Sequence, residues 1–195
     1  SLSYKWTDKI QQTLKVESSH ELYHSENQEL KYSYEQTDIQ VFLQGRLTPF
    51  FRMAGGYQYR LNGAGENSHR IIQQATLLQR ETAFRLGHRW RSDQTIYSTD
   101  PVKWRLRYRL SVEIPLEGQS LDEGEYYLVM SGEPIYSTQN GVSDLETRLN
   151  SSLGYLINYM NKLEAGMDFR LEGMLDDPVR KTLWLRVGWY HVISN

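Results

Sequence analysis

The segment His20-Glu21-Leu22-Tyr23-His24 matches the H-E-x-x-H pattern of zinc peptidases. In that chemistry two histidines on one face of a helix bind Zn²⁺, and the glutamate acts as a general base. The preceding residues, 14–17, alternate as a strand does, and on a strand the glutamate would point away from both histidines. We therefore expect no metal and no other cofactor, with His20 and His24 as the metal-ligand candidates.

Nucleophilic catalysis has even less support in the spacing. Ser111 and Ser152 could serve a Ser–His–acid hydrolase, but the remaining histidines, His69, His88 and His191, are scattered, and no spacing selects a set. The chain has no cysteine, which excludes thiol chemistry and disulfides. We expect no catalytic residues, and the alternative is an outer-membrane hydrolase directed to lipid or peptide.

The composition describes a chain of one domain, residues 1–195, with 24 acidic and 22 basic residues and a net charge of -2. A nucleic-acid partner would normally demand a basic surplus, so we expect none. The longest apolar runs, such as 126–130, fall far short of the roughly 18 residues that a membrane helix needs. If the protein is exported, its signal peptide has already been removed.

The segment 102–115 alternates between apolar and polar residues over an unusual length. One parity is apolar or aromatic: Val102, Trp104, Leu106, Tyr108, Leu110, Val112 and Ile114. The other parity is mostly charged: Lys103, Arg105, Arg107, Arg109, Ser111 and Glu113. A membrane-spanning strand needs roughly 9–11 residues with one face in lipid, so this pattern predicts an outer-membrane β-barrel.

Similar segments recur along the chain, and no helical period competes with them. They predict about ten strands: 12–24, 32–47, 50–61, 70–80, 84–96, 102–115, 125–137, 144–159, 163–173 and 181–193. Long polar connections nearly alternate with tight ones, as in an antiparallel up-and-down barrel, although 116–124 is long where a tight turn is expected. An even number of strands would place both termini at the same end.

Alternation alone does not decide which face points inward, because a soluble lipocalin-like barrel has its apolar face inside. The charged parity carries both signs, and a narrow barrel has room only for its own side chains. We therefore expect a polar lumen plugged by Arg–carboxylate pairs. The expected network is Arg105, Arg107, Arg109, Glu113, Glu146, Arg148, Asp168, Arg170 and Glu172. A small channel, lined by the arginines, is the competing interpretation.

Several short segments recur in a familiar order. They are 54–60 (AGGYQYR), 69–74 (HRIIQQ), 87–91 (GHRWR), 105–110 (RLRYRL), 114–116 (IPL), 132–136 (GEPIY), 148–149 (RL) and 153–155 (LGY). In this the chain resembles the uncharacterised outer-membrane barrels of Gram-negative bacteria called domain of unknown function 2490. The resemblance implies fold and location and brings no catalytic residues. Barrels of this kind commonly end in an aromatic residue, whereas this chain ends in Ser194-Asn195.

Fold and resemblance together lead us to expect a structural or accessory protein of the bacterial outer membrane, with no enzymatic activity. Its expected partner is outer-membrane lipid. A place in a larger cell-envelope complex, with other outer-membrane or periplasmic proteins, is compatible with this role.

Overall fold

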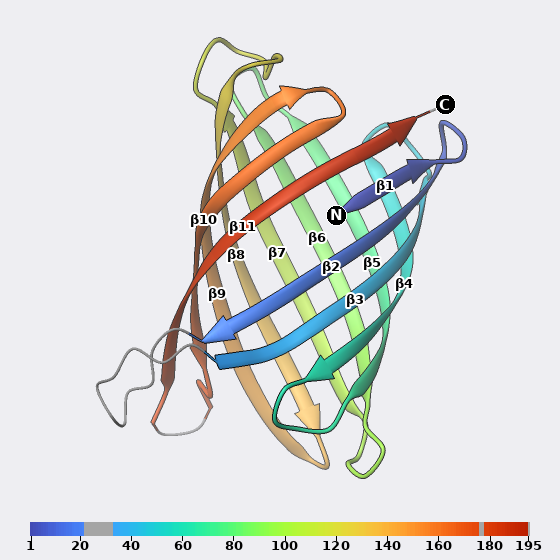
Figure 1. The fold of residues 1–195 in the computed structure, drawn as a ribbon, viewed down its shortest axis with the longest axis vertical. Coiled ribbons are helices and arrows are strands. Elements are labelled where there is room, and N and C mark those ends of the chain that lie inside the picture. The colour runs from blue at the N-terminus through green and yellow to red at the C-terminus, as the bar shows by residue number, and fades with distance from the viewer. Residues whose placement is uncertain (22–32, 176–177, 195) are drawn as a thin grey trace.

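The computed structural model describes residues 1–21, 33–175 and 178–194, which form strands and connections and no helix. Eleven strands make one closed barrel, with all of them tilted against its long axis (Figure 1). They are β1 (Leu2–Lys5), β2 (Ile10–Glu21), β3 (Ser33–Arg46), β4 (Phe51–Asn62), β5 (Ser68–Arg80), β6 (Arg85–Ile96), β7 (Lys103–Pro115), β8 (Tyr126–Gln139), β9 (Val142–Asn158), β10 (Asn161–Glu172) and β11 (Arg180–Ser194).

The ten strands expected from the alternation correspond to β2 through β11, which confirms the all-β barrel. Each of them pairs antiparallel with the next along the chain. The strand that was not expected is β1, which lies between β2 and β11 and closes the barrel. Four residues are too few to show a period, so the sequence pattern did not reveal it.

The eleventh strand corrects two expectations. In an up-and-down order with an odd count, the first and last strands run in the same direction, and β1 is accordingly parallel to β11. The barrel is therefore mixed and not wholly antiparallel. The two termini do not lie together at one end: the N-terminus lies partway along the wall and the C-terminus at an end (Figure 1).

The connection between β8 and β9 is tighter than the polar loop expected there. Asn140 and Gly141 have φ of 51° and 78°, so both central residues adopt the left-handed conformation. An Asn-Gly pair suits such a two-residue turn, whose twist matches that of the flanking strands. The long connection at 116–125 does lie at the opposite end from this turn, with the tight turns β3–β4 and β9–β10.

Burial in this barrel is the reverse of that in a water-soluble protein. Among the described residues the buried apolar side chains are four, namely Ile72, Tyr127, Ile135 and Leu156, whereas thirteen polar or charged residues are buried. Large apolar side chains face outward along every long strand, and Leu106 of β7 is 61% exposed. In the described part of the chain no helix is long and apolar enough to cross a membrane.

Candidate functional site: the charged barrel interior

The charged parity of each strand faces the inside of the barrel. Side chains from strands that are not neighbours meet there: the guanidinium of Arg91 on β6 lies 5.4 Å from the ring centre of Phe42 on β3. Likewise the hydroxyl of Tyr127 on β8 donates a hydrogen bond of 2.9 Å to Glu164 on β10. Both contacts pass over at least one intervening strand on the inner wall of the barrel, so polar side chains occupy the interior.

Glu133 of β8 is the centre of the largest charged cluster, and it is only 1% exposed. Its Oε1 accepts hydrogen bonds from Arg89 Nη2 at 2.8 Å and from Arg107 Nε at 3.0 Å. Its Oε2 accepts from Arg109 Nη2 at 2.6 Å. With a further bond of 3.0 Å from Arg109 Nε to Oε2, four charge-assisted hydrogen bonds satisfy both carboxylate oxygens, which makes burial of this charge tolerable.

Asp93 of β6 is the centre of a second cluster and is fully buried. Its Oδ1 lies 2.6 Å from Arg105 Nη2 and 3.5 Å from Arg70 Nε. Its Oδ2 lies 3.8 Å from Arg107 Nη1. Arg107 therefore joins the two clusters, and the side chains of β5, β6, β7 and β8 form one continuous layer of charge.

The other expected network residues pair more locally. Glu146 pairs with Arg148 on its own strand, as Asp168 does with Arg170 at 3.1 Å. Glu113 of β7 pairs with Arg85 of β6 at 2.7 Å and approaches Lys162 at 4.0 Å. Glu172 pairs with Arg180 at 2.5 Å near the end of the barrel.

The carboxylates beside Arg107 and Arg109 are therefore Glu133 and Asp93, which the expected network did not include. Asp93 lies on the charged parity of its predicted strand, which is a signal visible in the sequence. Glu133 is the one carboxylate on the inward parity of β8, where Tyr127, Val129, Ser131 and Ile135 are its neighbours. Because those neighbours are apolar or small, no alternation of charge marked it.

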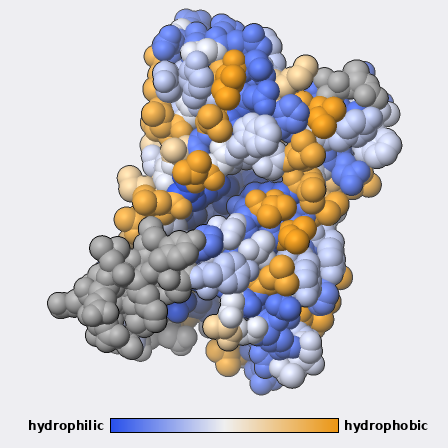
Figure 2. All heavy atoms as spheres, in the orientation of Figure 1, coloured by the Kyte–Doolittle hydropathy of each residue, from blue (hydrophilic) through white to orange (hydrophobic). Residues whose placement is uncertain are grey.

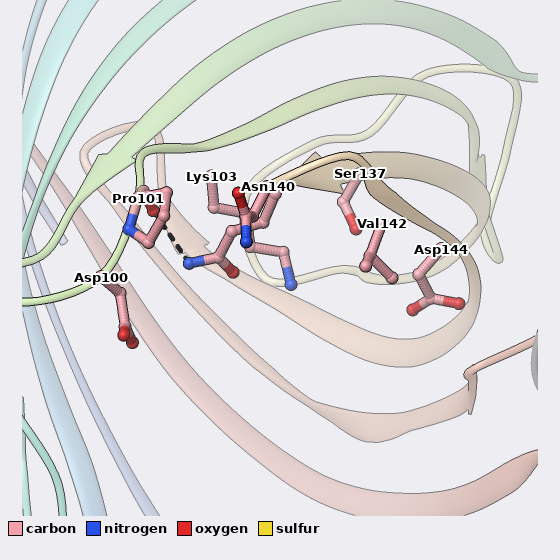
Figure 3. A pocket seen from close by; sticks show the side chains of 8 residues that line it. Asp100, Pro101, Lys103, Ser137, Asn140, Val142 and Asp144 are labelled. Carbon is pink, nitrogen blue, oxygen red and sulfur yellow. Dashed lines mark hydrogen bonds between the residues drawn. The ribbon is translucent and has the colours of Figure 1, made fainter.

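A pocket of about 400 Å³ opens at the mouth of the barrel where β8 turns into β9 (Figure 3). It lies between the β6–β7 connection, the start of β7, the end of β8 and the start of β9. Gln139 Nε2 donates a hydrogen bond of 2.9 Å to the carbonyl of Pro101 across it. The titratable side chains that line it are Asp100, Lys103 and Asp144, so it offers charge and hydrogen bonds and no histidine base.

Glu66 ties two connections together at the same end of the barrel. Its Oε1 accepts a hydrogen bond from the backbone N–H of Ser98 at 2.5 Å, and its Oε2 accepts one from Thr99 Oγ1 at 2.9 Å. These hydrogen bonds from Ser98 and Thr99 lower the pKa of the Glu66 carboxyl below its ordinary value.

The candidate catalytic residues are not brought together. His20 lies on β2, whereas His24 lies outside the described residues. Within residues 1–21, 33–175 and 178–194 no three or more His, Cys, Asp or Glu side chains form a metal-binding group.

Neither of the two candidate nucleophiles is hydrogen-bonded to a histidine in the described residues. Ser111 Oγ donates to the carbonyl of Gly87, and Ser152 Oγ to Asn150. His69 and His88 instead contact the outward-facing tyrosines Tyr57 and Tyr108. One Ser–His hydrogen bond, which the spacing did not single out, joins Ser18 Oγ and His20 Nε2 at 3.0 Å, in an exposed position on β2.

Comparison with known proteins gives one match. The model of a family described as a protein of unknown function, DUF2490, matches residues 2–171. That range covers most of the chain and confirms the resemblance noted from the order of short segments. No curated protein and no solved structure matches this chain.

Proposed function

The chain belongs to the DUF2490 family of proteins of unknown function, and from this premise we propose that it is a bacterial outer-membrane β-barrel with a structural or accessory role. In this proposal the strands β2 to β11 span the outer membrane of a Gram-negative bacterium, and the interior is closed by its ion pairs. The partner of the outer face is lipid.

The reversed burial carries the proposal. A protein in water buries its apolar side chains, and its polar ones stay at the surface. Here Glu133 and Asp93 are buried among arginines, while Leu106, Leu185 and Val187 face outward and are 61%, 71% and 87% exposed. An apolar outer band around a polar interior is the arrangement that a bilayer stabilises.

Aromatic side chains at both ends of the strands add support. At the end with the tight turns, the rings of Tyr126 and Tyr155 contact each other at a tilt, and Trp189 lies beside His191. At the other end, Tyr57 and Tyr59 contact His69. Outer-membrane barrels carry aromatic girdles of this kind at the two membrane interfaces.

The interior supports a structural role better than transport. Arg107 bridges two buried carboxylates inside the barrel, and each ion pair on the inner wall fills space that a permeating ion would need. The catalytic alternative has less support, because neither candidate nucleophile, Ser111 or Ser152, is hydrogen-bonded to a histidine in the described residues. A partner in the cell envelope would then be bound by the barrel's surface or its connections.

Fractionation of native membranes tests this function. We expect the chain in the outer-membrane fraction, resistant to washing with alkaline carbonate and released by detergent. Mass spectrometry of the detergent extract, compared with an extract from cells that lack the protein, would show any envelope protein that co-purifies. Recovery of the folded chain in the soluble fraction, without detergent, would contradict the proposal.

A further inference from the structure

Three arginines lie at the mouth of the barrel, at the end marked C in Figure 1. Arg46 ends β3, Arg52 is the second residue of β4, and Arg80 ends β5; we call them the arginine cluster. Arg46 and Arg52 lie directly opposite each other in the register, and Arg80 has the inward parity of the buried Arg70. In the same orientation Figure 2 shows largely hydrophilic surface at the top, and Arg46 and Arg80 are exposed. The cluster is therefore accessible to a polar ligand.

The arginine cluster differs from its neighbours because no carboxylate forms an ion pair with it. Further along β4, Arg60 pairs with Asp38 at 2.6 Å, and on β6 Arg85 pairs with Glu113 at 2.7 Å. The cluster makes none of the ion pairs found in the described residues, and neither does Glu81, the acidic residue of the β5–β6 turn. Every connection between strands at this end belongs to the described residues. Three positive charges thus lie together without an ion-pair partner from the described part of the chain.

Arg52 shows most directly that a negative charge would fit here. Its Nε atom is buried and has no hydrogen-bond partner among the described residues. The resolved electrostatic interactions of its guanidinium group are with Arg46 and Arg80, and both are repulsive. Like charges directly opposite each other on neighbouring strands are destabilising, and a buried donor without an acceptor costs free energy. An acceptor with negative charge, placed among the three guanidinium groups, would remove both costs.

The number and shape of the guanidinium groups indicate which anion this is. A guanidinium group is planar, and its paired N–H groups match the oxygens of a carboxylate or a phosphate. A phosphate monoester carries about −1.5 to −2 charge at neutral pH and three strong acceptor oxygens, so it can accept hydrogen bonds from all three arginines. A carboxylate has two oxygens and a single charge, which leaves more of the positive charge of the cluster uncompensated.

We propose that the arginine cluster binds a phosphate group, supplied by a lipid headgroup or by a free phosphate ion. Arg46 and Arg80 contact it from the exposed rim, and the half-buried Arg52 donates its Nε–H to it. The turn between Arg46 and Arg52 presents Leu47 and Phe50, which are 63% and 53% exposed. These side chains would pack against the acyl chains of a bound lipid, whereas a free ion would not touch them. The two sources therefore differ in affinity, and the experiment separates them.

Radiolabelled inorganic phosphate is the probe, and equilibrium dialysis measures its binding to the protein purified in an uncharged maltoside detergent. The test variant is Arg46→Gln/Arg80→Gln, because both side chains are exposed and their loss should leave folding intact. The matched control is Arg180→Gln/Lys181→Gln, which removes the same charge from exposed positions at the opposite end of the barrel. Circular dichroism checks that both variants keep their strands.

We expect saturable binding that is at least about tenfold weaker in Arg46→Gln/Arg80→Gln, since the loss of one charge-assisted hydrogen bond is enough for that factor. The control should bind as the wild-type protein does. Unlabelled phosphate and the short-chain lipid dihexanoyl phosphatidic acid then compete for the labelled ion. Displacement by the lipid at concentrations at least about tenfold below those of unlabelled phosphate would assign the site to a lipid headgroup. Displacement at similar or higher lipid concentrations would assign it to free phosphate.

Other results would overturn the proposal. If binding is not saturable, or is equally strong in Arg46→Gln/Arg80→Gln, the cluster is not a phosphate site. Equal weakening in the control would assign the effect to the overall charge of the protein. Displacement of the labelled ion by a glutamate-rich peptide at lower concentrations than by unlabelled phosphate would mean that the cluster binds an acidic segment of a protein. All of these measurements are made in detergent, so their outcome does not depend on the membrane location proposed above.

Discussion

Arg107 lies between the two buried carboxylates, with its Nε 3.0 Å from Glu133 Oε1 and its Nη1 3.8 Å from Asp93 Oδ2. Each carboxylate has further arginine partners, but Arg107 is the side chain that contacts both. Removal of one partner from a buried ion pair is costly because the remaining charge loses its compensation while it stays away from water.

Arg107→Ala should therefore lower the free energy of unfolding by about 3 kcal/mol, the lower end of the usual range, since Arg89, Arg109 and Arg105 still compensate the carboxylates. Urea unfolding of the barrel in lipid vesicles, followed by tryptophan fluorescence, measures this change. The control is Arg180→Ala, whose side chain is 76% exposed and whose pair with Glu172 should contribute less than about 1 kcal/mol. Equal effects of the two substitutions would contradict the central role of Arg107.

The outer face of β7 gives a second prediction. Leu110 faces outward from the middle of the strand, so Leu110→Arg should destabilise the barrel in a bilayer by about 2–4 kcal/mol. Leu116→Arg is the matched control, because Leu116 is exposed in the connection after β7, where water is near. Folding yield into vesicles reports both. If Leu110→Arg folds as well as Leu116→Arg, the outer face of β7 is not in lipid.

How far the sequence predicts this fold can be judged from β7 and β1. Thirteen alternating residues leave little choice of secondary structure or face, so β7 and the other long strands were predictable. β1 has only Leu2–Lys5, and its place in the barrel follows from closure between β2 and β11. Closure is a property of the whole barrel and leaves no local signal.

Which charged side chains pair with each other inside the barrel depends on the register of the strands. Arg107 lies directly opposite Arg91 on β6 and Ile135 on β8, and neither can pair with it. It reaches Glu133 and Asp93 diagonally, one row away on each neighbouring strand. Alternation predicts which side chains face inward, but it does not predict how far one strand is shifted along the next. The arginine cluster around Glu133 was therefore not predictable.

The hydrogen bonds between Glu66 and the β6–β7 connection should weaken at low pH. Hydrogen bonds from Ser98 and Thr99 lower its pKa in the folded protein below the unfolded value. The contribution of Glu66 is therefore present above the unfolded pKa and is lost as the pH falls through the folded pKa. Hydrogen exchange at the Ser98 amide should accelerate relative to the intrinsic rate in that range, and Glu66→Gln should abolish the pH dependence. An unchanged dependence in Glu66→Gln would assign it to another group.

The zinc motif gives a prediction about metal content. Because His20 lies on a strand, we expect the purified protein to hold no stoichiometric zinc after dialysis against zinc-free buffer. Elemental analysis measures the zinc content. The control for any bound metal is His191→Ala. His191 lies on β11, where it contacts Asn161, at the end of the barrel away from His20. About one equivalent of zinc, lost in His24→Ala and retained in His191→Ala, would reinstate the peptidase interpretation.

The last prediction concerns conduction through the barrel. The Glu133 and Asp93 clusters join β5, β6, β7 and β8 along the inner wall, and Arg91 reaches Phe42 on β3. An ion crossing this layer would have to displace charge-assisted hydrogen bonds, so planar bilayers with the inserted wild-type protein should show no steady single-channel current. Protease protection on the same preparation checks insertion, so that an absence of current is not mistaken for a failure of the protein to insert. The Arg180→Ala variant, whose substitution lies outside this layer of charge, should likewise show no steady current. Steady currents whose size or ion selectivity changes in Arg107→Ala would mean that ions pass this layer, and the protein would then be a small channel.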